Sequence, residues 1–284
     1  MGEKLKLFQM FLILLKTLHS KQMIRNISLP ASKVAAMVGK NPYCKISEIY
    51  DEMKCRITGE KVKTLNDTQP LNKNELIKLF KNLHPNKIMK QEDLNLERIL
   101  KLSCNSAIKC KTTTQCHVIE KDIKEKIANI FPEKNLQLVG DFITKDINTN
   151  RGTRNENKII QNYNKRHVTI ITDNNSQLYK YPLVDIKGSD GVLYKFHISA
   201  KIDGLQDNIL IEVKNRRNRL FTKIPTYEKI QMEIYLRILN LDTAKLVQNF
   251  NDTSSELLYN TDDVLWNYIL ENLHKFTCDL LRKE

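Results

Sequence analysis

Cysteine, glycine and long apolar runs are scarce in this sequence, and each shortage excludes a class of protein. Six cysteines in 284 residues are too few for a disulfide-built scaffold. Cys104, Cys110 and Cys116 are separated by five residues each, a wider gap than zinc sites usually have. The eight glycines are scattered without the spacing of a nucleotide-cradling loop. We therefore expect free thiols, no zinc centre and no P-loop.

The most apolar run, residues 7–15, is too short to cross a bilayer, which takes about 20 residues. Residues 16–21 offer no small-residue cleavage site of the kind that follows a signal peptide. Lys6 stands where myristoylation requires serine or threonine. We expect a buried helix over residues 7–15 in a protein that is intracellular (host cytoplasm or nucleus if the source is viral), is not secreted and has no membrane partner.

Acidic residues are in the minority, and the net charge is +13. Such a surplus suits a polyanionic partner, nucleic acid first and an anionic membrane surface second.

Residues 192–202 alternate between apolar and polar side chains, which predicts a half-buried strand. Asp203-Gly204 and Asp207-Asn208 are turn sequences of the kind that joins antiparallel strands. A second strand, residues 209–214, carries Glu212 and Lys214 on one face. We expect a hairpin that brings Asp203 to a strand end near this pair.

Two carboxylates and an ammonium group suit a site for a hard cation. Mg²⁺ is held by one or two carboxylates together with substrate phosphates, and we expect Mn²⁺ to substitute for it. A lysine beside the metal can orient or help to deprotonate an attacking water. A solvated strand face carrying the same residue types is the alternative. The pattern Asp203-x8-Glu212-x-Lys214 resembles the PD-(D/E)XK nuclease superfamily, with Ile202 in place of the proline.

Two segments that flank the hairpin favour a metal site over a strand face that only contacts solvent. Residues 226–239 have the apolar spacing of a helix, with Gln231 at the edge of the buried face. Gly152-x3-Glu156 is predicted to open another helix, and Glu156 shares the face of its apolar residues. A carboxylate on such a face needs a partner or a metal. The alternative for Glu156 is an acid that stabilises the start of the helix.

The order Gly-x3-Glu, Asp-Gly, Glu-x-Lys and then Gln is similar to the YqaJ-type viral recombinase family, which includes lambda exonuclease-like enzymes. The resemblance covers residues 152–240, and Lys229 stands where the family has the first Gln of its Gln-x-Gln helix. It implies a metal held by Asp203, Glu212 and the Val213 carbonyl, and a second metal or a water on Glu156. It also implies that Lys214 activates the attacking water and that Gln231 holds this water or the lysine.

A second block of resemblance lies near the N-terminus, where Ser32 is a candidate N-cap and Gly39 a candidate C′ residue of a short helix. The resemblance implies that Arg25 and Ser32, seven residues apart, hold the 5′-phosphate end of DNA. A plain helix cap and a surface arginine are the alternative. After Lys214, three arginines form a basic loop that we expect to contact backbone phosphates rather than only solvent: Arg216, Arg217 and Arg219.

The fold we expect is α/β, with a PD-(D/E)XK (restriction-endonuclease-like) core in which a central mixed sheet is flanked by helices. The 284 residues would form a single nuclease domain with a mostly helical insertion at about 60–150. Helices are expected in it at 74–83, 92–102 and 118–131, and residues 256–284 are predicted to form a closing amphipathic helix.

These features predict a Mg²⁺-dependent deoxyribonuclease. The resemblance implies 5′-to-3′ digestion of duplex ends in viral or phage recombination or genome processing. It further implies a single-strand annealing protein as partner and a ring-shaped trimer. An endonuclease with the same centre, a DNA-binding protein with a decayed nuclease fold, and RNA as the substrate all remain open.

Overall fold

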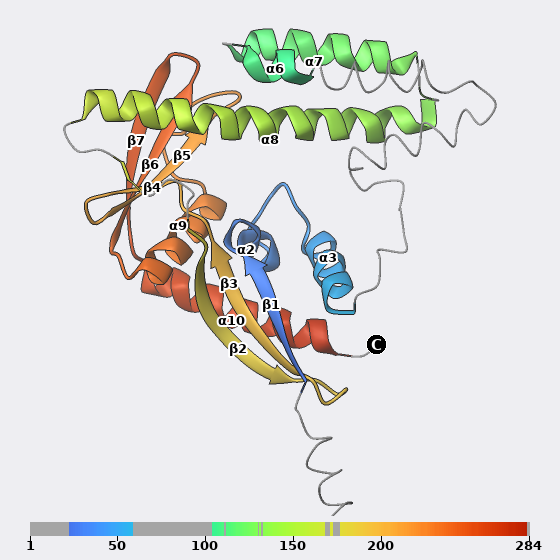
Figure 1. Ribbon diagram of the computed structural model, residues 1–284, viewed down its shortest axis with the longest axis vertical. Coiled ribbons are helices and arrows are strands. Elements are labelled where there is room, and N and C mark those ends of the chain that lie inside the picture. Colours follow the sequence, from blue (N-terminus) through green and yellow to red (C-terminus); the bar gives the residue numbers. More distant parts are fainter. Residues whose placement is uncertain are drawn as a thin grey trace, which may run out of the picture.

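The computed structural model describes residues 23–58, 104–110, 112–129, 131, 133–167, 171–172 and 177–282. The helices predicted at 7–15, 74–83 and 92–102 lie outside these ranges. Within them the fold is mixed α/β, as predicted, but the strands form two mixed sheets flanked by helices instead of one central sheet (Figure 1). No helix in the described ranges is long and apolar enough to span a membrane.

The first sheet contains β1 (Ile24–Pro30), β2 (Tyr179–Lys187) and β3 (Leu193–Ala200) in the order β1-β3-β2. β3 runs parallel to β1 and antiparallel to β2. The predicted alternation holds in β3, because every second residue from Tyr194 to Ala200 is buried. The strand therefore lies with one face on the core.

The second sheet has the order β4-β5-β6-β7, from β4 (Gly204–Gln206), β5 (Ile209–Asn215), β6 (Thr243–Phe250) and β7 (Thr253–Asn260). The hairpin prediction was only partly right, because β5 pairs with the short β4 and not with β3. The turn at Asp207, which has φ of +54°, is where it was expected. Gly204 allows the close approach of Ile171, whose side chain would lie 2.2 Å from an added Cβ.

Helices α2 (Ala31–Met37), α9 (Thr226–Leu239) and α10 (Asp263–Leu281) pack on the sheets, and α3 (Ile46–Thr58) packs on α2 and α10. Helix α9 has the predicted bounds and ends at Asn240, a left-handed residue. The closing helix begins later than predicted, because residues 253–260 form β7 and the Asp262 side chain caps α10 by accepting from the Leu265 amide at 3.0 Å.

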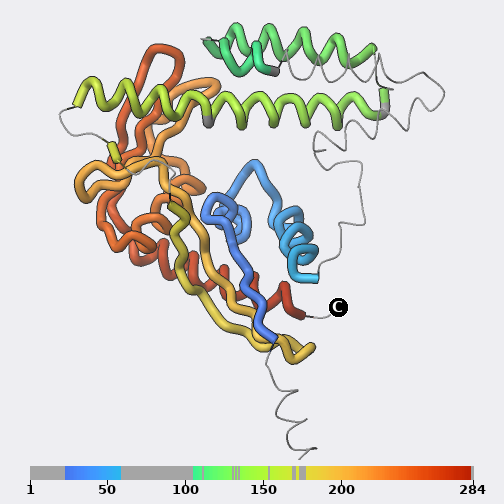
Figure 2. The backbone as a smooth tube through the Cα atoms, viewed as in Figure 1, coloured from blue at the N-terminus to red at the C-terminus, as the bar shows by residue number. Residues whose placement is uncertain are grey.

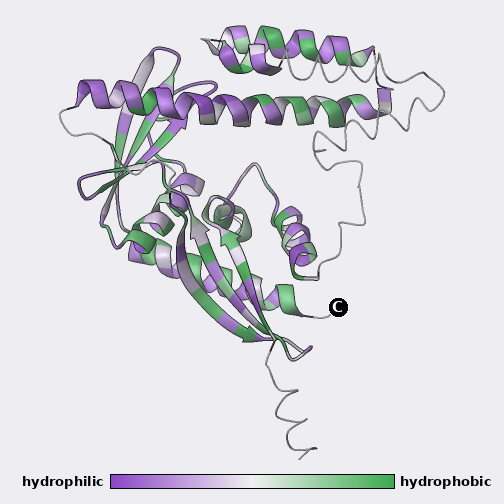
Figure 3. Cartoon of the chain, in the orientation of Figure 1, coloured by the Kyte–Doolittle hydropathy of each residue, from purple (hydrophilic) through white to green (hydrophobic). Residues whose placement is uncertain are grey.

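The remaining helices form a lobe beside the second sheet: α6 (Cys104–Lys109), α7 (Thr113–Ala128) and the 34-residue α8 (Glu133–Arg166). Helix α7 was predicted at 118–131 but begins at Thr113, because Thr112 and Gln115 form a capping box. Gly152 does not open a helix as predicted. It lies inside α8, within a polar stretch, residues 148–158, that separates the apolar residues up to Ile147 from those that begin at Ile159; apolar side chains lie towards both ends of the helix (Figure 3).

Helix α8 connects the lobe to the second sheet (Figure 2). Its first half packs on α6 and α7 around a small core that includes Ile123 and Ile143. Its second half places Ile159, Ile160 and Tyr163 against the second sheet. Glu156 is therefore carried on the stretch of α8 that joins these two contacts.

Candidate active site

Asp203 lies between the two sheets, immediately before β4, and its carboxylate contacts strand β5. The Val213 amide donates to Asp203 Oδ2 at 2.8 Å. Strand β4 begins at Gly204, opposite Ile211, so the side chain of the preceding Asp203 takes the place of a strand partner for Val213. Because the N–H and C=O of one strand residue point to the same side, the Val213 carbonyl faces the Asp203 side of β5.

Glu212 and Lys214 lie next to each other on β5, and Gln231 reaches them from helix α9. The Lys214 ammonium pairs with Glu212 Oε1. Gln231 Nε2 donates to the same oxygen at 3.0 Å. The structure therefore brings together residues from a strand and from a helix that are 19 positions apart, as the sequence predicted.

The other carboxylate oxygen of Glu212 is a buried acceptor with no hydrogen-bond donor among the described residues. The Glu212 side chain is only 2% exposed. Burial, and next the Asp203 carboxylate, raise the pKa of Glu212 to about 8, against the opposing effect of Lys214. A buried carboxylate oxygen left without a donor is costly unless a cation or a donor binds it. Glu212 Oε2 is thus suited to a ligand that the chain does not supply.

The charges around Lys214 keep it protonated. Burial lowers its pKa, but the Glu212 and Asp203 carboxylates more than reverse this effect and raise the pKa above its ordinary value. Glu156 on α8 belongs to the same electrostatic neighbourhood. Burial, and next the Asp203 carboxylate, raise the pKa of Glu156, while Lys214 lowers it. All five predicted centre residues therefore lie in one region between β5, α8 and α9.

The donor set fits a hard cation with few protein ligands. Across the described ranges, no three His, Cys, Asp or Glu side chains are grouped closely enough to hold a metal ion. Mg²⁺ does not require such a group, because it keeps several waters and often binds only one or two carboxylates. Asp203, Glu212 and the Val213 carbonyl meet this requirement.

Tyr235 was not predicted and belongs to the same site. It is buried on α9, one turn after Gln231, and its hydroxyl lies 2.7 Å from Gln231 Nε2. Burial, and next the Glu212 carboxylate, raise the pKa of Tyr235. Two contacts thus fix the Gln231 amide, one to Tyr235 and one to Glu212. The sequence shows that Tyr235 follows Gln231 by four residues. It does not show that the tyrosine hydroxyl accepts a hydrogen bond, because a tyrosine among apolar residues usually serves only in packing.

Arg25 and Ser32 do not lie together. Arg25 is near the start of β1, and at about 3.3 Å per residue Pro30 is about 16 Å from it. Ser32 follows in the first turn of α2 and is exposed, but the N-cap of that helix is Pro30 and not Ser32. One phosphate group cannot contact both side chains in this conformation. The C′ position predicted for Gly39 is confirmed by its φ of +69°.

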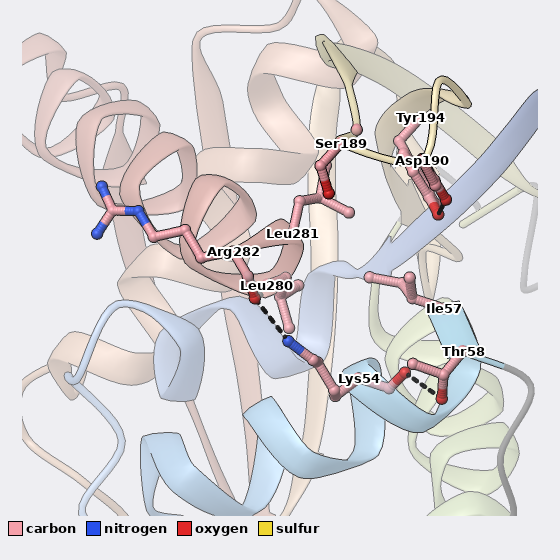
Figure 4. A pocket seen from close by; sticks show the side chains of 10 residues that line it. Lys54, Ile57, Thr58, Ser189, Asp190, Tyr194, Leu280, Leu281 and Arg282 are labelled. Atoms are coloured by element: carbon pink, nitrogen blue, oxygen red, sulfur yellow. Dashed lines mark hydrogen bonds between the residues drawn. The ribbon is translucent and has the colours of Figure 1, made fainter. Parts of the chain in front are cut away.

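Arg25 instead binds the end of helix α3. Its guanidinium donates to the Ile57 carbonyl at 2.7 Å, which satisfies an acceptor at the helix C-terminus. A pocket of about 560 Å³ lies at this end of β1 and is lined by residues that include Lys54, Asp190 and Arg282 (Figure 4). Lys54 donates to the Arg282 carbonyl there. The pocket shares no residue with the candidate site.

Arg216 is not available to DNA, contrary to the prediction. Its guanidinium is buried, binds both carboxylate oxygens of Glu228 at 2.5 and 2.7 Å, and donates from Nε to Gln248 at 2.7 Å. The Phe221 ring covers the guanidinium at 4.3 Å. A run of basic residues is normally exposed to solvent. Here one arginine of the run, Arg216, is buried because it pairs with the buried Glu228 carboxylate on α9. Arg216 therefore fixes the loop that follows Lys214.

The Arg216→Ala variant is expected to lose about 3–5 kcal/mol of stability, because it leaves Glu228 buried without its cation. Urea denaturation measures this loss. Arg219→Ala changes an exposed arginine of the same loop and should leave the midpoint unchanged. A loss below about 1 kcal/mol for Arg216→Ala would contradict the structural role.

Arg217 joins the loop to the helical lobe. It donates to Glu120 on α7 at 2.6 Å and to Asn148 on α8 at 2.8 Å. Glu120 also accepts from Thr144 at 2.6 Å and is itself buried. Of the three predicted phosphate-binding arginines, Arg219 is the one that the structure leaves exposed.

No family model matches the chain, and no curated protein matches it. Solved structures resemble it at low identity. A crystal structure of an alkaline exonuclease from Laribacter hongkongensis is 16% identical with a TM-score of 0.46, over 89% of this chain and 87% of that chain. A phage-related exonuclease from Haemophilus somnus is 14% identical with a TM-score of 0.36, over 47% of this chain and 71% of that chain. Because the identities and the TM-scores are this low, these structures carry no functional argument, and the function of the chain is inferred from the side chains around β5.

Proposed function

We propose that the chain is a Mg²⁺-dependent nuclease that hydrolyses DNA phosphodiester bonds. The observation that carries the proposal is the buried Glu212 carboxylate, with one oxygen held by Lys214 and Gln231 and the other without a donor among the described residues. Asp203 lies beside it on the same strand edge. A solvated strand face would not bury this carboxylate or bind it from a second element.

Asp203, Glu212 and the Val213 carbonyl would hold the metal. A bound Mg²⁺ would stabilise charge on the phosphate and lower the pKa of a bound water. The proposed partner of the site is the DNA backbone, which the net charge of +13 favours. The resemblance in sequence extends the proposal to a viral or phage enzyme, an annealing-protein partner and a trimeric ring.

The chain itself supplies the positioning and the positive charge of the site. Lys214, kept protonated by two carboxylates, would orient the attacking water and donate a hydrogen bond to the phosphate oxygen. Gln231 would hold Glu212 in place, because its amide is fixed from both sides. Glu156, on the opposite side from α9, would bind a further water through its partly buried carboxylate.

The preferred activity is 5′-to-3′ exonuclease action on duplex ends, with internal cutting as the alternative. The test compares a linear duplex carrying 5′-phosphates with the same DNA as a closed circle, each incubated with Mg²⁺. Loss of the linear form alone supports the exonuclease. Nicking or linearisation of the circle shows an endonuclease. Binding without cleavage in Mg²⁺ and Mn²⁺ would leave only a DNA-binding protein.

Salt dependence separates the two arginines that follow the site. The Arg219→Ala variant is expected to lower the slope of log affinity against log salt by about one, because an exposed phosphate contact is lost. Arg217→Ala should leave the slope unchanged, because the Arg217 charge is already paired with the buried Glu120 carboxylate. Fluorescence anisotropy without divalent metal measures both slopes. A lower slope for Arg217→Ala together with an unchanged slope for Arg219→Ala would contradict the proposed roles of the two arginines.

A further inference from the structure

Tyr43 is the one exposed aromatic side chain in the described ranges, and it is 78% exposed. It lies in the loop between α2 and α3, which leaves α2 through the left-handed Gly39. The loop has a defined shape at this point, because the Tyr43 amide donates to the Asn41 side chain at 2.9 Å. The ring is therefore presented on an ordered turn.

Tyr43 contacts Tyr227, the second residue of helix α9. The two ring centroids are 5.7 Å apart, and the ring planes make an angle of 84°. Such an edge-to-face pair fixes the orientation of one ring by the other. Tyr227 is half-buried, so it supports the exposed ring from beneath.

This aromatic pair lies beside the candidate active site. Tyr227 precedes Gln231 by four residues, so the two side chains are neighbours on one face of α9, about 5–6 Å apart at Cβ. Gln231 contacts Glu212 directly. Helix α2, from which the loop of Tyr43 starts, packs on α9. The exposed Tyr43 ring thus contacts a tyrosine that lies one helical turn from Gln231, which in turn contacts Glu212.

We infer that Tyr43, held by Tyr227, is a stacking platform for an unpaired nucleobase of the substrate strand. The inference rests on the proposed nuclease function and adds that the substrate is single-stranded, or is frayed, next to the cleaved bond. A base can stack on a flat ring only when one face of that ring is open, as the exposure of Tyr43 allows. Aromatic platforms of this kind bind single strands without sequence preference.

The alternative role for Tyr43 is an apolar anchor that only fixes the loop. An anchor requires burial, and most of the Tyr43 ring is open to solvent. The two roles predict different responses to substitution. Leucine preserves apolar contact with Tyr227 but cannot stack, whereas phenylalanine and tryptophan preserve stacking.

The test measures binding of a fluorescein-labelled twelve-residue oligothymidylate by anisotropy, without divalent metal, in the Lys214→Ala background so that no cleavage occurs. Tyr43→Leu is expected to weaken binding about tenfold, in line with the stacking of one base. Tyr43→Phe and Tyr43→Trp should bind within about twofold of the parent. Ile46→Ala, which removes another exposed apolar side chain near the loop, should bind like the parent.

A second measurement identifies the stacked base. Single abasic sites are placed along the oligonucleotide, and one position should weaken binding to the parent but not to Tyr43→Leu. Equal binding of Tyr43→Leu and parent, equal losses for leucine and phenylalanine, or no binding of single strands would each overturn the inference. Metal-dependent cleavage by the protein with Lys214 intact is scored separately, so failure of the nuclease proposal is distinguished from failure of the platform.

Discussion

Replacing Lys214 by alanine is expected to lower the rate of DNA cleavage by about 10³-fold while DNA affinity stays within about threefold, since the loss of one positioned hydrogen-bond donor at the reacting group costs about 10²–10³-fold. Lys214 pairs with Glu212 and lies in the field of Asp203, so its charge is placed where the phosphate would bind. Single-turnover cleavage of an end-labelled duplex in Mg²⁺ measures the rate.

Lys245 provides the matched control for this prediction. It is a partly buried lysine on the neighbouring strand β6 and pairs with Glu256 at 3.2 Å. Lys245→Ala should therefore cleave DNA at close to the parent rate. Cleavage by Lys214→Ala within tenfold of the parent would show that Lys214 has no part in the chemistry.

The second large effect is expected from Glu212→Gln, which keeps the size of the side chain but removes its negative charge. Without this charge the site should lose its affinity for Mn²⁺, and cleavage should fall by about 10³-fold, since a metal supplies several kcal/mol of charge stabilisation. Titration calorimetry with Mn²⁺ measures the binding, and the cleavage assay measures the rate.

Glu233→Gln is the control for Glu212→Gln, because Glu233 is an equally buried carboxylate on α9. It accepts from Arg237 at 2.8 Å and from Tyr259 at 2.6 Å, so both of its oxygens have donors. This variant should lose stability but bind Mn²⁺ like the parent. Normal Mn²⁺ affinity in Glu212→Gln would place the metal elsewhere.

Local patterns in the sequence predicted the elements that carry the site. The alternation in β3 reflects the burial of one face, whereas the apolar residues of α9 belong to a helix that is buried on all sides from Met232 to Leu236. Asp203, Glu212, Lys214 and Gln231 came together because a turn joins β4 to β5 and α9 packs behind β5. These elements follow one another closely in the sequence, so the spacing of their residues was enough to predict that the four side chains meet.

Long-range pairing was not visible in the same patterns. The chain changes sheets between β3 and β4, at the point where Gly204 lies close to Ile171 from a separate segment. Arg216 is buried because Glu228 on α9 meets it, and Arg217 faces a lobe about a hundred positions earlier. The pairing of Arg25 with Ser32 failed because the residues between them are extended and not coiled.

The central claim is that a divalent cation binds Glu212 Oε2 together with Asp203. Anomalous diffraction from crystals soaked in Mn²⁺ tests it most directly, because the metal is located without reference to activity. We expect one strong peak in contact with Glu212, Asp203 and the Val213 carbonyl. The absence of a peak there, or a peak held by other residues, would contradict it.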